Sequence, residues 1–113
     1  MNNKIVNASI VAILFGSSLA FAATGKVVIL SPANGVTVSS KDMIKLSYEA
    51  DPGPGGDHLH LNVDGKRMDV IHKLKGVAEV SPLEPGKHQI CLLVNTKGHV
   101  PIGEETCVDV ISK

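Results

Sequence analysis

Short stretches of alternating apolar and polar residues run along most of the chain, and each stretch ends at a group of turn-forming residues. Successive side chains of a strand point to opposite faces, so this alternation is typical of strands that bury one face. Gly, Pro, Asn and Asp fill the breaks, and no stretch after residue 22 keeps a helical period. The pattern predicts strands at residues 26–31, 43–50, 58–63, 66–74, 77–80, 88–94 and 106–111.

The apolar positions within these stretches predict the core. Residues two apart lie on the same face of a strand, and the chain repeats Ile, Leu, Val or Tyr at that spacing. About seven short strands separated by regular turns are typical of a β-sandwich, in which two sheets pack their apolar faces together. The expected core residues are Ile44, Leu46, Tyr48, Leu59, Leu61, Val63, Ile90, Leu92, Val94, Val108 and Val110.

Three motifs resemble those of bacterial immunoglobulin-like modules. Residues 31–38, which read Ser-Pro-Ala-Asn-Gly-Val-Thr-Val, are similar to the opening segment of such modules. Val63-Asp64-Gly65 is similar to the exit from their third strand, and residues 83–88 resemble the entry to their sixth strand. The resemblance covers nearly all of residues 23–113. It implies an all-β fold, a single immunoglobulin-like β-sandwich of about seven strands, but this fold carries many functions and does not indicate an activity.

The first 22 residues have the layout of a signal peptide. Lys4 precedes an apolar run over residues 10–15, and Ala20-Phe21-Ala22 forms an A-x-A cleavage site. The apolar run is too short for a membrane span, which needs about 20 residues. We therefore expect cleavage before Ala23, a periplasmic or secreted domain over residues 23–113, and no stable membrane anchor after cleavage.

The composition argues against several classes of function. The chain holds 11 Lys and Arg and 11 Asp and Glu, scattered along its length, so it lacks the basic face of a nucleic-acid-binding protein. After residue 22, Tyr48 is the single Phe, Trp or Tyr, which leaves no rings for stacking on sugars or bases. The sequence also lacks a G-x-S-x-G motif and a paired-carboxylate motif. We expect a binding protein rather than an enzyme.

The two cysteines, Cys91 and Cys107, predict a disulfide. An even number of cysteines in an exported chain favours oxidation. A symmetric hairpin of the last two strands places Cys91 opposite Cys107, on the face away from the core, at a distance that a disulfide can bridge. Closing a loop of this size stabilises a domain by about 3 kcal/mol in the chain-entropy model. The functional alternative is a dithiol that binds a metal or acts in redox chemistry.

His58 and His60 predict half of a metal site. They lie two apart on a strand, so both imidazoles project from the face opposite Leu59. The third and sixth strands of an immunoglobulin-like sheet are antiparallel neighbours, so the third strand starts beside the end of the sixth. The loop that follows the sixth strand carries His99, which can therefore reach His58 and His60. If Asp64-Gly65 forms a two-residue turn, His60 pairs with Asp69, which can orient an imidazole or bind the ion. Imidazole suits copper and zinc, and copper binds nitrogen sites more tightly.

The histidine motifs carry a second resemblance. Residues 58–64 are similar to the H-H-H-L-L-I-D motif of a family of short, uncharacterised exported bacterial proteins. His88 resembles the histidine of that family's G-x-H motif, and His99-Val100-Pro101 resembles its H-V-P-H motif. Leu59 stands in place of the middle histidine of the first motif, and Ile102 stands in place of the last histidine of the second. The family therefore has more potential ligands than this chain.

Two functions follow from these observations. The first is an exported module that binds copper or zinc through His58, His60 and His99 and serves in carriage or sequestration. The second is a metal-free interaction or accessory domain that binds an unidentified periplasmic protein. We expect His72 to face inward or lie near a strand end, and His88 to serve in a turn or in packing. Convergence of the first three histidines favours the metal-binding function.

Overall fold

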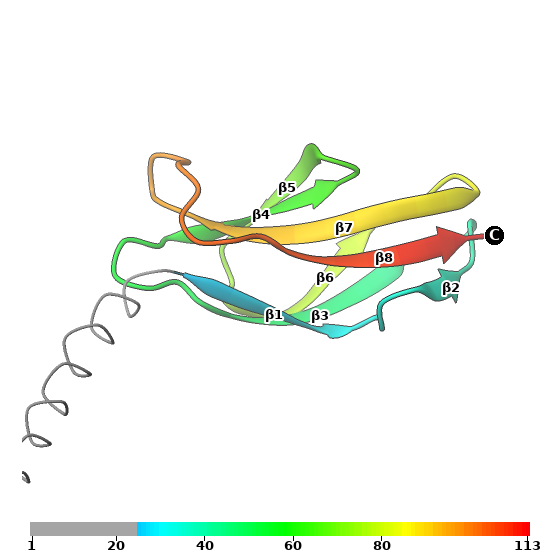
Figure 1. Cartoon of the computed structure of the whole chain (residues 1–113), viewed down its shortest axis with the longest axis horizontal. Helices are drawn as coiled ribbons and strands as arrows, with labels where there is room; N and C mark the ends of the chain where they lie inside the picture. The colour runs from blue at the N-terminus through cyan, green and yellow to red at the C-terminus, as the bar shows by residue number, and fades with distance from the viewer. Residues whose placement is uncertain (1–24) are drawn as a thin grey trace, which may run out of the picture.

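The computed structural model describes residues 25–113, which form two β-sheets (Figure 1). The predicted signal peptide lies outside the described residues. Within residues 25–113, no helix is long and apolar enough to cross a membrane. The strands are β1 (Lys26–Ser31), β2 (Val36–Val38), β3 (Ile44–Asp51), β4 (His58–Val63), β5 (Lys66–Ile71), β6 (Lys75–Val80), β7 (Gly86–Asn95) and β8 (Thr106–Ser112).

The sheets have the orders β1-β3-β6 and β2-β8-β7-β4-β5. All neighbouring strands are antiparallel except β2 and β8, which are parallel. The apolar faces of the two sheets meet in one core, which confirms the predicted all-β sandwich. Every core residue that the alternation predicts is buried, and Val27 and Val80 join them.

The sequence pattern misses β2 and misplaces some strand ends. The three residues of β2 are too few to show alternation, and their partner is the end of β8, far away in the sequence. Strand β5 stops at Ile71, and Leu74 belongs to the connection to β6 rather than to the strand. The fold therefore has eight strands rather than seven.

The predicted disulfide is present. Cys91 on β7 lies directly opposite Cys107 on β8, their Cα atoms are 4.1 Å apart, and their sulfur atoms are bonded. Neighbouring residues Ile90 and Leu92 face the core, so the disulfide lies on the other face of the sheet. It closes the hairpin that carries the β7–β8 loop.

The topology brings three connections to one end of the sandwich. Strand β4 lies between β7 and β5, and its first residue, His58, is paired with Asn95, the last residue of β7. The loop before β4, the loop after β7 and the segment after β5 therefore meet there. Figure 1 shows the β7–β8 loop above the start of β4 at this end.

Candidate metal centre

Strand β4 presents His58 and His60 on its outer face, as predicted from their spacing. Leu59 and Leu61 point into the core, and the two imidazoles project away from it. Neighbouring side chains cover both histidines, which leaves His58 2% exposed and His60 8% exposed. Two such imidazoles, held on a central strand, have little freedom to move apart.

His99 reaches the same place from the β7–β8 loop. Its φ of 66° puts it in the left-handed region, which non-glycine residues seldom occupy. The loop fixes this conformation through backbone hydrogen bonds: His99 N donates to Thr96 O at 2.9 Å, and Thr96 N donates to Val100 O at 2.8 Å. A bridge between Asn95 and Pro101 closes the base of the loop. Such conformations cluster at binding sites, where the rest of the fold maintains them.

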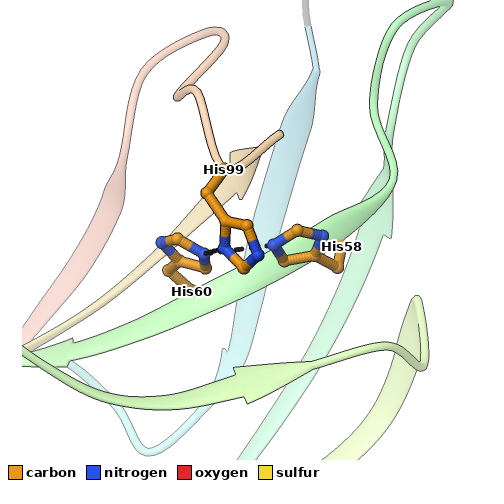
Figure 2. Close-up of side chains that lie close together, drawn as sticks. All are labelled: His58, His60 and His99. Atoms are coloured by element: carbon orange, nitrogen blue, oxygen red, sulfur yellow. Dashed lines mark hydrogen bonds between the residues drawn. The ribbon is translucent and has the colours of Figure 1, made fainter. Parts of the chain in front are cut away.

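The three histidines named from the sequence as candidate ligands converge in the structure. His60 Nε2 lies 3.1 Å from His58 Nε2 and 3.1 Å from His99 Nδ1. Figure 2 shows the His99 ring extending from its loop toward the other two rings. Nitrogen ligands about 2.05 Å from one ion lie about 2.9 Å apart in square-planar geometry and about 3.3 Å apart in tetrahedral geometry. The spacing of the nitrogen atoms therefore fits ligands of a single ion.

The protonation of these rings leaves lone pairs inside the cluster. His58 Nδ1 donates to Asp57 Oδ2 at 2.9 Å, so in the neutral ring Nε2 has a lone pair. Burial lowers the pKa of His60, and the charges of His58, Arg67 and His99 lower it further. A neutral imidazole has one N–H, so His60 Nε2 can donate to only one of its two nitrogen neighbours. The cluster thus has the deprotonated nitrogen atoms that a metal ion requires.

Asp57 holds the His58 ring from the side away from His60. The hydrogen bond from His58 lowers the pKa of Asp57, so the carboxylate is charged at neutral pH. A carboxylate that accepts the second N–H of a metal-binding histidine fixes the orientation of the ring and raises its basicity. Asp57 is not among the site residues predicted from the sequence, although it directly precedes the His58-Leu59-His60 motif.

The prediction for Asp69 is wrong. Val63 pairs with Lys66 as expected. Asn62 then pairs with Arg67, but Leu61 pairs with Asp69, so β5 has a β-bulge in which Met68 is the extra residue. Asp69 therefore lies on the same face as Leu61, opposite to the face of the histidines. Its carboxylate accepts a hydrogen bond from Val70 N at 2.8 Å.

The same bulge places His72 beside the cluster. Leu59 pairs with Ile71, the last residue of β5, so the residue after it, His72, comes opposite His58. His72 follows the end of β5, as predicted, and it is exposed. Its ring centroid lies 5.4 Å from that of His58. His72 is not among the site residues predicted from the sequence, because a bulge that changes the register leaves no signal in the alternation.

His88 lies at the other end of β7, as predicted, and takes part in no cluster with the other histidines. Its Nδ1 lies 2.6 Å from Asp64 Oδ2, and its Nε2 lies 2.7 Å from Glu84 O. Both hydrogen bonds raise the pKa of His88, and the bond to Asp64 has the larger effect. His88 thus ties the β4–β5 turn to the start of β7.

Asn95 contributes a buried oxygen next to the cluster. It pairs with His58 across β4 and β7, so both side chains share the outer face of the sheet. The side chain is fully buried, Nδ2 donates to Leu93 O at 3.0 Å, and Oδ1 has no hydrogen-bond partner. A buried acceptor without a partner is costly, and a metal ion or a water molecule bound to one would satisfy it.

No protein-family model and no curated protein matches this chain. Among solved structures, the fibronectin(III)-like modules of Clostridium thermocellum CbhA are similar, with a TM-score of 0.64, 15% identity, and coverage of 78% of this chain and 96% of that one. A Jonesia denitrificans lytic polysaccharide monooxygenase matches with a TM-score of 0.51 and 16% identity, over 74% of this chain and 60% of that one. These similarities confirm the immunoglobulin-like fold. A disulfide together with such a fold is typical of extracellular proteins.

Proposed function

We propose that the protein is exported and binds one copper ion through His58, His60 and His99, with zinc as the competing metal. The observation that carries this proposal is the convergence of three imidazole nitrogens, with His60 Nε2 3.1 Å from each of the other two. Three further features support it: the carboxylate of Asp57 on His58 Nδ1, the lowered pKa of His60 and the orphaned oxygen of Asn95.

Copper is the preferred ion because of the ligand set. All three ligands are imidazoles, which suit both Cu(II) and Zn(II), and Cu(II) binds a given nitrogen site more tightly. The two cysteines of the described chain are oxidised and supply no thiolate for a zinc or Cu(I) site. An oxygen from Asn95 or from water would complete four-coordination.

The role that fits this site is carriage or sequestration rather than catalysis. His58 and His60 are buried, whereas His99 is exposed at the tip of a surface loop. An ion held in this way is reachable from one side, where a partner's ligands can replace His99. Signal-peptide cleavage before Ala23 would deliver the domain to the periplasm or the exterior, where the disulfide is stable.

Calorimetric titration of the oxidised protein with Cu(II) and Zn(II) tests the proposal. We expect Cu(II) to bind with a Kd of about 1 µM or lower. The His58→Ala/His60→Ala variant should lose this binding, and His99→Ala should weaken it at least tenfold. His99 is exposed, so its removal leaves the core intact, and His88→Ala is the matched control. Wild-type binding that is absent, or that is unchanged in the His99→Ala variant, would overturn the proposal.

One observation favours a metal-free interaction domain as the second candidate. Val28, Leu30 and Val77 are each more than half exposed. Val28 pairs with Glu49 and Val77 with Ser47, so both lie on the outer face of the β1-β3-β6 sheet. Exposed apolar side chains that form a contiguous patch are typical of contacts with a protein partner. Cross-linking to a periplasmic protein that is lost in Val77→Asp but retained in His99→Ala would support this function.

A further inference from the structure

His58 offers a ligand atom on each side of its ring. Nε2 faces His60 Nε2 at 3.1 Å, inside the three-histidine cluster. Nδ1 points to the opposite side, where it meets Asp57 Oδ2 at 2.9 Å. The proposed copper site uses the first nitrogen only. The second nitrogen, Nδ1, belongs to another group of possible metal ligands, which includes Asp57.

His72 completes this second group. The bulge in the β4–β5 pair brings it opposite His58, and the centroids of the two rings are 5.4 Å apart. Within the three-histidine cluster the centroid separations are 4.6, 5.0 and 5.2 Å, so His72 lies nearly as close to His58 as the other ligands do. Asp57, His58 and His72 each have a ligand atom within 4.8 Å of the other two.

We propose that Asp57, His72 and Nδ1 of His58 form a second cation position, for Cu²⁺ or Zn²⁺, that shares the His58 ring with the first. The inference rests on the proposed function, because the first ion occupies Nε2 of the same ring. When the second ion binds, the proton on Nδ1 leaves to solvent and the nitrogen lone pair passes to the metal. Asp57 then changes from hydrogen-bond acceptor to ligand. Imidazole and carboxylate are both ordinary ligands of these ions.

The second position is the more exposed and the weaker of the two. Asp57 and His72 are exposed, whereas His58 and His60 are buried. Two dications that share one imidazole repel each other, and the charge of Asp57 offsets part of this repulsion. With bonds of about 2 Å to each nitrogen, the ions lie about 6 Å apart. That exceeds the roughly 3.5–4 Å of hydrolytic two-metal sites, so the pair does not have the spacing for that chemistry.

Titration with Cu(II), followed by calorimetry and electron paramagnetic resonance, tests the inference. We expect the wild-type protein to bind two ions and His72→Ala to bind one, with the affinity of the first ion changed less than about threefold. His88→Ala, which removes a distant histidine, should still bind two. The first equivalent should give a full copper signal. The second should lower the signal per ion, because a bridging imidazolate couples the two unpaired electrons.

The outcomes separate this inference from the proposed function. A wild-type capacity of one ion, or a capacity of two in His72→Ala, would overturn the second position while the first ion still depended on His60 and His99. A second equivalent that adds a full independent signal would overturn the sharing of the His58 ring. Binding that does not depend on His60 and His99 at all would instead overturn the proposed function.

Discussion

Replacing His99 with glycine should separate the stability of the protein from its metal binding. His99 has a φ of 66°, and its loop conformation rests on backbone hydrogen bonds that no side chain at position 99 supplies. A residue with a Cβ atom costs about 1–2 kcal/mol in the left-handed region, and glycine avoids this cost. Glycine also makes the unfolded chain more flexible, which costs about 0.4–1 kcal/mol.

The difference between two variants measures this strain. Both His99→Gly and His99→Ala lose the imidazole, so both should bind Cu(II) at least tenfold more weakly than the wild type. The glycine variant should be more stable than the alanine variant by about 0.5–1 kcal/mol. For a domain of this size, that corresponds to several degrees in Tm. Urea unfolding without metal gives the free energies, and calorimetry gives the affinities.

Lys97 in the same loop provides the matched control. Its φ is not positive, so at this position alanine should be the more stable replacement. An Ala variant at position 99 that equals or exceeds the Gly variant in stability would contradict the strained conformation. A Gly variant that keeps wild-type affinity for Cu(II) would show that His99 is not a ligand, whatever the stabilities are.

Three further predictions concern the disulfide, Asp57 and the Asp64–His88 pair. Replacing Cys91 and Cys107 by alanine opens a loop that spans 16 positions and should destabilise the protein by about 3 kcal/mol in urea unfolding. Asp57→Asn should weaken binding of the first ion by about 10–100-fold in calorimetry, since the ring of His58 loses its carboxylate partner. The Asp64–His88 pair raises the pKa of His88 and lowers that of Asp64. The pair is therefore fully stabilising only below the unfolded pKa of histidine and above that of aspartate, between about pH 4 and 6.5. The difference in Tm between the wild type and His88→Gln should be largest near pH 5.5 and should shrink as the pH rises above about 6.5 and His88 loses its proton. A difference that does not vary with pH would show that this contact is not an ion pair.

Much of the fold and of the site follows from the sequence because both depend on regular strands. The alternation in residues 58–63 sets the faces of β4, so it determines that His58 and His60 project together. The antiparallel pairing of β4 with β7 then places the β7–β8 loop, and with it His99, at the start of β4. The disulfide follows from the same hairpin register.

The rest of the site depends on irregular backbone that leaves no periodic signal. A single inserted residue, Met68, moves Asp69 to the core side of the sheet and His72 to the position opposite His58. Asp57 belongs to the loop before β4, which is rich in Gly and Pro and whose conformation no alternation encodes. The left-handed conformation of His99 is equally invisible in the sequence, because glycine, the usual residue at such positions, occurs just before it at Gly98.

The bulge also explains why one end of the sandwich collects so many ligands. In a regular β4–β5 pair that starts at Val63 and Lys66, the residue opposite His58 would be Ile71, an apolar side chain. With one residue inserted, that position falls to His72, and the row across β7, β4 and β5 becomes Asn95, His58 and His72. Every member of this row has a metal-binding atom, and the two ring nitrogens of His58, the central member, face His60 and Asp57. Deleting Met68 should therefore remove the bulge without changing this row, because Asp69, Val70, Ile71 and the following His72 keep their partners on β4. Both proposed positions should survive the deletion, and a capacity of one Cu(II) ion in that variant would contradict this register.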